Sequence, residues 1–276
     1  MSLFERVVFS LQGKMHTPAL YGGYHILCLL VVIASAALLC TFLRDAKWKT
    51  VRNLLACSLA VMVILELCKQ LVYSMNVENG AVTWSYQWYA FPYQFCSTPI
   101  YVLPFALLLP EGRRRDACIA FLSSFALFGG LAVMIYPGDV FTSYTVINIQ
   151  TMVHHGLQVV LGIYLAVYTR RRLGRRYYVG AVVVFLILVA VALLLDIGIH
   201  HALVAAGLAD QTFNMFFISP YHPCTLPLLS LIQPHLPYPL FLLLYILGFS
   251  LVAALMHAAV YGIFSHFKKR GGHAKA

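Results

Sequence analysis

The sequence has few charged residues, and this scarcity argues against an ordinary soluble domain. Only 10% of its 276 residues are Asp, Glu, Lys or Arg, whereas 61% are hydrophobic, and the mean hydropathy is +0.82. Soluble domains are about one-quarter charged and about half apolar. The charges also cluster between apolar runs instead of spreading along the chain. This pattern is typical of a polytopic membrane protein, and the length suffices for about seven spanning helices with short loops.

Acidic residues are especially scarce, which leaves a strongly basic chain. Nine Asp and Glu residues stand against 19 Lys and Arg residues, giving a formal net charge of +10. In a soluble protein this balance would suggest nucleic acid, but here the basic residues lie in short loops beside apolar runs. There they set membrane orientation and contact anionic headgroups. We therefore expect the membrane bilayer as a partner, and no nucleic acid.

Other absences narrow the architecture further. The sequence shows no second soluble domain, no low-complexity linker and no convincing internal repeat, so we predict one domain over residues 1–276. Segment 1–21 has no continuous apolar stretch, and we expect no typical signal peptide there. The seven cysteines include no C-x-x-C pair. Most of them lie in or beside apolar runs, where a free cysteine is most simply a small buried hydrophobe.

Seven apolar segments predict an all-α fold of seven transmembrane helices. A spanning helix needs about 20 mostly apolar residues. The third segment is short and contains Pro99 and Pro104, so we expect it to be kinked. Segment 1–21 would lie outside the membrane, and residues 267–276 would form a basic cytoplasmic tail. The predicted helices cover residues 22–43, 53–73, 92–109, 117–136, 146–168, 178–204 and 239–266.

The connecting segments alternate in charge, and this alternation predicts an orientation. Four basic segments follow helices one, three, five and seven, so all four fall on one side of the membrane. The opposite loops have almost no Lys or Arg and are rich in aromatic residues and proline. Because positive loops stay in the cytoplasm, we predict the N-terminus outside, the C-terminus in the cytoplasm and a location in the cell membrane. The basic segments are residues 44–52, 111–116, 170–176 and 268–270.

Polar residues inside the predicted helices gather at one depth, in the outer half of the membrane. Ionisable groups within a span are energetically costly and usually functional. Five helices contribute to this depth, which predicts one buried, water-accessible pocket. Interhelical hydrogen bonds and ion pairs, such as Glu66 with Lys69, would explain the same residues one by one. The set comprises His25, Glu66, Lys69, Gln70, Tyr73, Gln94, Cys96, Ser97, Asn148, Thr151, His154, His155, Gln158, Asp196, His200 and His201.

Cys96 is the candidate nucleophile of this set. It follows shortly after a proline, which is favoured in the first turn of a helix, so we expect Cys96 in the opening turns of the third helix. Unpaired N–H groups there favour an anion, and a nearby Lys69 or histidine makes a usable thiolate. A cysteine–histidine pair is the minimum for nucleophilic acyl transfer, with helix N–H groups, Gln94 or Ser97 as oxyanion donors. The alternatives are a packing role for Cys96 and a disulfide with Cys224.

Two motifs resemble those of a known family. Residues 92–97, PYQFCS, look like the signature of the YwaF family of bacterial integral membrane proteins, whose animal relative is transmembrane protein 164. Residues 149–156, IQTMVHHG, resemble the histidine-bearing segment of that family. Length and the seven-helix pattern also agree, so the resemblance covers nearly the whole chain. One departure is Gln94, because bacterial relatives often have histidine at this position.

The resemblance implies a lipid acyltransferase that needs no cofactor or metal. In the animal branch, a cysteine takes an acyl group from one phospholipid and passes it to a lysophospholipid, assisted by a histidine. Carried onto this chain, Cys96 is the nucleophile and His154 or His155 is the base. The family's cysteine–histidine separation favours His154, whereas helical spacing leaves both open. The expected supporting or substrate-binding residues are Gln94, Ser97, Glu66, Lys69, Asn148, Thr151, Asp196 and His200.

Two other function classes stay open from the sequence alone. A zinc-dependent seven-helix hydrolase, similar to the alkaline ceramidases, would use histidine and aspartate ligands, and Asp196 and His200 share one helical face. A transporter or receptor is the non-enzymatic alternative, although no inverted repeat supports transport and residues 239–266 contain no lysine for a retinal Schiff base. The proline-rich loop 219–227 is a candidate lid. The further zinc-ligand candidates are His154, His155, His201 and His222.

Overall fold

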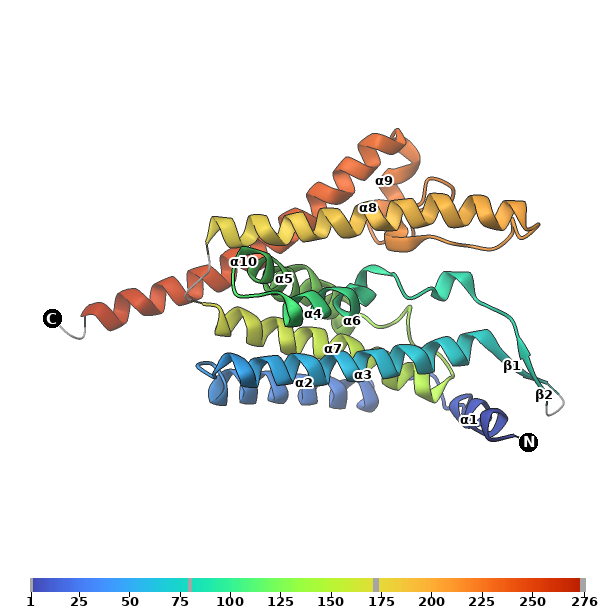
Figure 1. Cartoon of the computed structure of the whole chain (residues 1–276), viewed down its shortest axis with the longest axis horizontal. Coiled ribbons are helices and arrows are strands. Elements are labelled where there is room, and N and C mark those ends of the chain that lie inside the picture. Colours follow the sequence, from blue (N-terminus) through green and yellow to red (C-terminus); the bar gives the residue numbers. More distant parts are fainter. Residues whose placement is uncertain (1, 79–80, 171–173, 274–276) are drawn as a thin grey trace.

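The computed structural model describes residues 2–78, 81–170 and 174–273, which are mostly helical (Figure 1). Its main elements are α1 (Leu3–Leu11), α2 (Gly23–Phe42), α3 (Trp48–Ser74), β1 (Met75–Glu78), β2 (Ala81–Trp84), α4 (Thr98–Leu108), α5 (Arg113–Phe121), α6 (Leu127–Ile135), α7 (Thr145–Tyr168), α8 (Arg175–Ala205), α9 (Leu229–Ile232) and α10 (Tyr238–His273). Short 3-10 turns are η1 (Trp88–Ala90), η2 (Phe95–Ser97), η4 (Met215–Phe217) and η5 (Gln233–His235), and η3 (Leu122–Ala126) is a π-helical turn.

Six helices in the described part of the chain are long and apolar enough to cross a membrane, so the protein is a multi-pass integral membrane protein. They correspond to six of the seven predicted segments. The α5, η3 and α6 elements together form one of them. The spans are Gly23–Phe42, Trp48–Ser74, Arg113–Ile135, Thr145–Tyr168, Arg175–Ala205 and Tyr238–Ala259.

The segment predicted as the third spanning helix forms a shorter helix. Its helical part consists of three residues in η2 and 11 in α4. At about 1.5 Å per residue this is about 21 Å, whereas the hydrocarbon core is about 30 Å thick. Proline explains the late start, because Pro99 has no N–H to donate to Phe95. The Thr98 hydroxyl donates to the Phe95 carbonyl instead, at 2.7 Å.

Two of the membrane helices are central and the others surround them. Within the 18-residue apolar window of the α7 span and of the α5–α6 span, 72% of residues are buried, against 11–28% in the windows of the other four spans. Helices α2, α3 and α6 pack against α7, while α8 packs against α5 and α10 against η3. Figure 1 accordingly shows α2, α3 and α7 on one side of the α4–α6 group, and α8 and α10 on the other.

Glycine allows α6 and α7 to approach closely. A Cβ added at Gly130 would lie 2.7 Å from the Gln158 Cβ, and one at Gly162 would lie 2.6 Å from the Leu127 Cβ. Carbon atoms in contact are normally about 3.5–4.0 Å apart. The two helices therefore pack more closely than any larger residue at these positions would permit. This contact fixes the position of the polar face of α7.

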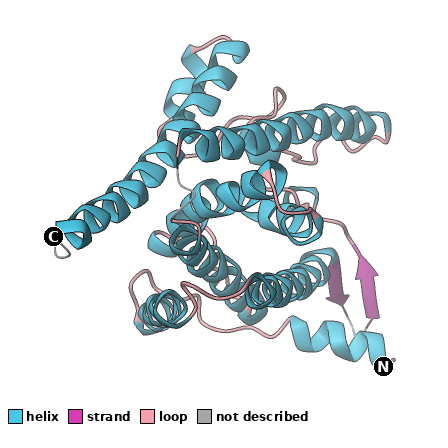
Figure 2. Ribbon diagram, turned by 60° about the vertical axis from the view of Figure 1, so that its left-hand side comes forward, coloured by secondary structure: helices cyan, strands magenta, loops and turns pink. Residues whose placement is uncertain are grey.

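The prediction of an all-α chain is wrong at one place, where β1 and β2 form an antiparallel hairpin with Val77 opposite Val82. The predicted outer segment 1–21 contains the amphipathic helix α1, which is capped by Ser2 and Glu5. The Gln12 side chain donates to the Met75 carbonyl and joins this segment to the hairpin. Figure 2 shows both strands beside the N-terminal helix, at one end of the bundle.

Basic connections meet at the opposite end of the bundle from this hairpin (Figure 1). The Arg170 guanidinium donates to the Arg44 carbonyl at 3.0 Å and to Asp45 at 2.5 Å, which ties the end of α7 to the α2–α3 loop. In the predicted tail 267–276, residues through His273 continue α10. Residues 274–276, like residues 171–173 of the third basic segment, lie outside the described residues.

Candidate functional site

Cys96 lies in η2, immediately before α4, and the residue is half-buried. The thiol donates to the Gly129 carbonyl of α6, with sulfur and oxygen 3.9 Å apart. A Cβ at Gly129 would approach the Phe95 ring to 2.9 Å and the Cys96 sulfur to 3.6 Å. The absence of a side chain at Gly129 therefore leaves room for the turn that carries the thiol.

Two side chains of α7 hold this turn by its backbone. His154 Nε2 and Gln158 Nε2 donate to the Cys96 carbonyl at 2.9 Å and 2.8 Å. The residues are one helical turn apart, and only 2% of each is exposed. Because a carbonyl accepts, Nε2 of His154 carries the proton and Nδ1 has the lone pair. That Nδ1 is buried with no hydrogen-bond partner among the described residues, so it is available as a base.

A buried ion pair on α3 lies next to this site. The Lys69 ammonium is 2.8 Å from the Glu66 carboxylate, and both side chains are less than 15% exposed. Gln70 donates to the same Glu66 oxygen at 2.8 Å and to the Ala90 carbonyl at 2.7 Å. Lys69 interacts electrostatically with Cys96 and with His154. A positive charge is therefore held where it can stabilise a thiolate or an oxyanion.

Several buried polar side-chain atoms of the helices have no protein partner. Within the described part of the chain, they occur on Glu66, Ser74, Arg115, His154, Gln158, Asp196, Tyr245 and Ser250, of which Glu66, His154 and Gln158 belong to the site described above. Most buried polar groups in proteins are hydrogen-bonded to protein or to water. These atoms consequently mark places where water or a polar substrate group can bind between the helices.

Gln94 and Asp196 hold the loop that follows α8. Gln94 donates to the Asn214 carbonyl at 3.0 Å and accepts from the Phe216 N–H at 3.1 Å, while Asp196 accepts from the Met215 N–H at 2.6 Å. Phe216 has a φ of 56°, a left-handed conformation that is costly for a large residue. Three hydrogen bonds therefore fix a strained turn, and the Gln94 amide is directed at this turn.

The other predicted site residues make hydrogen bonds with nearby backbone groups and not with the Cys96 thiol. His155 donates to the Thr151 carbonyl at 2.7 Å, and its ring lies beside that of His154 with centroids 5.4 Å apart. Asn148 exchanges two hydrogen bonds with the backbone of Thr142 and so closes the loop before α7. Ser97 is buried, and its N–H donates to the Gln94 carbonyl at 2.8 Å.

The outer histidines lie where the end of α8, which carries His200 and His201, meets the following loop, which carries His222. His200 stacks on Tyr221 with ring centroids 3.7 Å apart, and His201 bonds the Tyr221 hydroxyl at 3.1 Å. The Phe213 N–H points at His222 Nε2 at 3.5 Å. Burial, and secondly the neighbouring His200, lowers the pKa of His222 below its ordinary value. This cluster is an aromatic packing arrangement around Tyr221.

The geometry of the described residues supports neither the zinc site proposed for the histidines and Asp196 nor a disulfide between Cys96 and Cys224. Among the described residues, no three His, Cys, Asp or Glu side chains converge closely enough to hold a metal ion. Cys96 and Cys224 both have free thiols.

Three residues next to the nucleophile were not among the predicted site residues. Gln158 was in the predicted set of polar residues in the outer half of the membrane but was not assigned to the site, and it lies one turn beyond His154, so its spacing was a usable signal. The only sequence signal for Gly129 was its place in the pair Gly129-Gly130 within an apolar run. Tyr245, on α10, is fully buried and interacts electrostatically with Cys96 and Asp196, and its surroundings in the sequence are entirely apolar.

The fold and the site define a class: a multi-pass helical membrane protein with a cysteine and a histidine joined between its helices. A family model narrows this class, because it matches residues 20–261 and describes the TMEM164 family. The chain belongs to the TMEM164 family. Membership points in general terms to a membrane lipid acyltransferase, consistent with the predicted relation to transmembrane protein 164. Neither the curated proteins nor the solved structures include a match to this chain.

Proposed function

We propose that the protein transfers a fatty acyl group from a phospholipid to a lysophospholipid through a thioester on Cys96. The observation that carries the proposal is the pair of hydrogen bonds from His154 and Gln158 to the Cys96 carbonyl. They place the His154 imidazole, whose Nδ1 has no hydrogen-bond partner among the described residues, against the backbone of Cys96. A cysteine and a histidine on adjacent elements, inside an apolar bundle, are the pair that acyl transfer between lipids requires.

In the first half-reaction, His154 Nδ1 takes the thiol proton of Cys96 as the sulfur attacks the ester carbonyl carbon of the donor phospholipid. The resulting oxyanion collapses, and the bond from the carbonyl carbon to the glycerol oxygen breaks. The imidazolium returns the proton to that oxygen. A lysophospholipid leaves, and the acyl group stays on the sulfur as a thioester.

In the second half-reaction, the hydroxyl of an acceptor lysophospholipid attacks the thioester. His154 Nδ1 takes the hydroxyl proton, the carbon–sulfur bond breaks, and the proton passes to the departing thiolate of Cys96. Water is the competing acceptor, and its attack would give lipase activity. A buried site reduces this competition because access of bulk water is limited.

Lys69 and the positive end of the helix dipole at the start of α4 are the proposed oxyanion stabilisers. The Lys69 charge is held by Glu66 at 2.8 Å in a site of low exposure, where electrostatic interactions are stronger than in water. The dipole of α4 adds partial positive charge at its start, where the Thr98 N–H already donates to the Phe95 carbonyl and Pro99 has no N–H. The Gln94 amide already bonds the loop backbone, so we assign Gln94 and Asp196 a positioning role.

The length of the third segment gives a depth for Cys96. The helical segment from Phe95 to Leu108 is about 21 Å long, about 9 Å shorter than the hydrocarbon core. With Leu108 at the basic boundary of the core, Cys96 lies about 9 Å inside the opposite boundary, so the ester of a donor phospholipid must enter the bundle to reach the sulfur. We further propose that this segment completes a seven-helix arrangement, with the N-terminus outside and the basic end in the cytoplasm of a cell membrane.

A transfer assay tests this function. The purified chain is reconstituted in vesicles containing a phospholipid with an isotope-labelled acyl chain and an unlabelled lysophospholipid, and labelled product is measured by lipid mass spectrometry. Wild type should produce labelled phospholipid from the acceptor. Cys96→Ala should abolish the product, whereas Cys57→Ala, at an exposed thiol on α3, should retain it.

His154→Ala and His155→Ala form the second matched pair. Loss of a general base costs about 10²–10⁴-fold in rate, and we expect this loss for His154→Ala. A larger loss for His155→Ala, with His154→Ala nearly active, would assign the base to His155 instead. Full activity of Cys96→Ala would remove the thioester mechanism.

A further inference from the structure

A cavity of about 720 Å³ lies at the basic end of the bundle, between the starts of α5 and α8. We name it the α5–α8 pocket. It is separate from the Cys96 site, because the length of α4, about 16 Å, lies between them. Its lining includes Arg113, Asp116, Arg175, Arg176, Val179 and Gly180.

Close packing of two parallel helix starts creates this pocket. A Cβ added at Gly180 would lie 3.0 Å from the Ala117 Cβ, so α5 and α8 approach closely just beyond their first turns. Both helices are preceded by glycine, Gly112 and Gly174, which offers no side chain to cap the first N–H groups. Two sets of such donors, with the positive ends of two helix dipoles, therefore open toward one end of the bundle.

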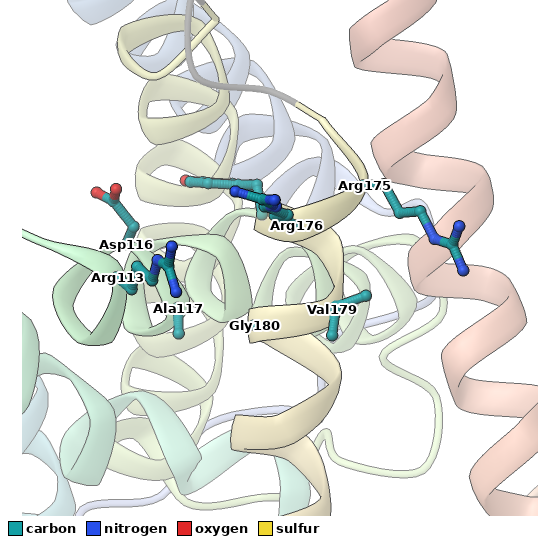
Figure 3. A pocket seen from close by; sticks show the side chains of 8 residues that line it. Arg113, Asp116, Ala117, Arg175, Arg176, Val179 and Gly180 are labelled. Carbon is teal, nitrogen blue, oxygen red and sulfur yellow. The ribbon is translucent and has the colours of Figure 1, made fainter.

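The polar lining of the pocket is mainly cationic. Three guanidinium groups and one carboxylate give it a net charge of +2. Figure 3 shows Arg113 and Asp116 next to each other on α5, with Arg176 beside them at the start of α8. The side chain of Arg175 extends from α8 toward α10. Arginine is well suited to phosphate because its planar N–H groups match the phosphate oxygens.

An apolar strip continues from the pocket along the exterior of α8. Val179 lines the pocket, and Val183 and Ile187 follow at intervals of one helical turn. Their side chains are 49%, 49% and 59% exposed. A ligand with a phosphate in the pocket and a hydrocarbon chain would therefore cover this strip, whereas a free anion would leave it uncovered.

We propose that the α5–α8 pocket binds the phosphate of an anionic phospholipid, whose acyl chain lies on the strip of Val179, Val183 and Ile187. Arg113 and Arg176 bind the phosphate oxygens, and the N–H groups at the helix starts supply further donors. The bound lipid joins α5 to α8 at their open ends. This site is independent of acyl transfer at Cys96.

The test measures lipid binding to the purified full chain in detergent by native mass spectrometry and thermal unfolding. The probes are dioctanoyl phosphatidylglycerol, dioctanoyl phosphatidylcholine and inorganic phosphate. Arg113→Gln/Arg176→Gln removes two charges from the pocket. Arg52→Gln/Arg114→Gln is the matched control, because both arginines are exposed, lie near the same end and do not line the pocket.

Wild type should bind phosphatidylglycerol, and each pocket arginine replaced should weaken binding about tenfold. The control variant should change binding by about twofold or less, because neither side chain lines the pocket and exposed charges are screened. Phosphatidylcholine and inorganic phosphate should bind at least about tenfold more weakly than phosphatidylglycerol.

Equal losses in the pocket variant and the control variant would overturn the proposal, because they would assign binding to overall charge. Equal affinity for inorganic phosphate would overturn the lipid assignment and leave a free-anion site. If the double variant does not fold, the single variants Arg113→Gln and Arg176→Gln decide: unchanged binding in both contradicts the proposal.

Discussion

Gly130→Ala offers a sharp test of the way in which α6 positions the catalytic face of α7. The new Cβ would lie 2.7 Å from the Gln158 Cβ and 2.9 Å from the His155 carbonyl oxygen. A normal carbon–carbon contact of about 3.5 Å requires the two helices to separate by about 0.8 Å. Cys96 contacts α6 through its thiol bond to Gly129, so we expect η2 to move with α6 and the hydrogen bond from Gln158 to the Cys96 carbonyl, now 2.8 Å, to lengthen to about 3.6 Å and be lost.

We expect overpacking to lower the free energy of unfolding of Gly130→Ala by about 1–3 kcal/mol. We expect the displacement of His154 to lower the acyl-transfer rate by up to about 10²-fold. Thermal unfolding and the transfer assay measure the two effects separately. Gly248→Ala is the matched control: a Cβ there meets nothing within 4 Å, so stability and rate should hold or improve slightly. A folded Gly130→Ala variant with the wild-type rate would refute the role given to the contacts with the Cys96 carbonyl.

Three further predictions concern the surroundings of the site. Lys69→Met leaves the buried Glu66 carboxylate without its counter-ion and should lower the free energy of unfolding by about 3–5 kcal/mol. The double variant Glu66→Gln/Lys69→Met should recover this stability in thermal unfolding but should not recover the transfer rate. Asp196→Leu removes the acceptor for Met215 and should cost about 1–3 kcal/mol, with faster hydrogen exchange across residues 213–219. The pKa of His222 is lowered in the folded state, so its contribution to stability is present above the ordinary histidine pKa and is lost as the pH falls below that value. The amides of the loop after α8 should therefore be less protected from hydrogen exchange at pH 5 than at pH 7, and this difference should be smaller in His222→Gln.

The spanning helices could be predicted because long apolar runs are interrupted by short charged loops, and six of these runs form long helices. The third run could not be judged from hydropathy alone. Its prolines shorten the helix, so that it begins at Phe95 inside the bundle rather than at Pro92. The β-hairpin had a sequence signal in the dipeptide Asn79-Gly80 between apolar residues, which was masked by the expectation of helices alone.

The candidate site could be predicted where its residues lie on one helix or follow a local signal. Cys96 after a proline and His154 on a polar stripe are such cases. Gln94 was expected at the sulfur, but it bonds residues about 120 positions later in the chain. The spacing of residues in the sequence does not predict such a long-range contact, because the contact depends on how the loop after α8 packs over the bundle. Tyr245 reaches the site for the same reason, through the packing of α10.

Mass spectrometry of the purified protein after incubation with phospholipid tests the central claim most directly. The account predicts an acyl adduct on Cys96 that is released by hydroxylamine, absent in Cys96→Ala and present in Cys57→Ala. Addition of lysophospholipid should discharge the adduct and yield acylated product. An unmodified Cys96 in a protein that still transfers acyl groups, or a Cys96 found bonded to Cys224, would contradict the account.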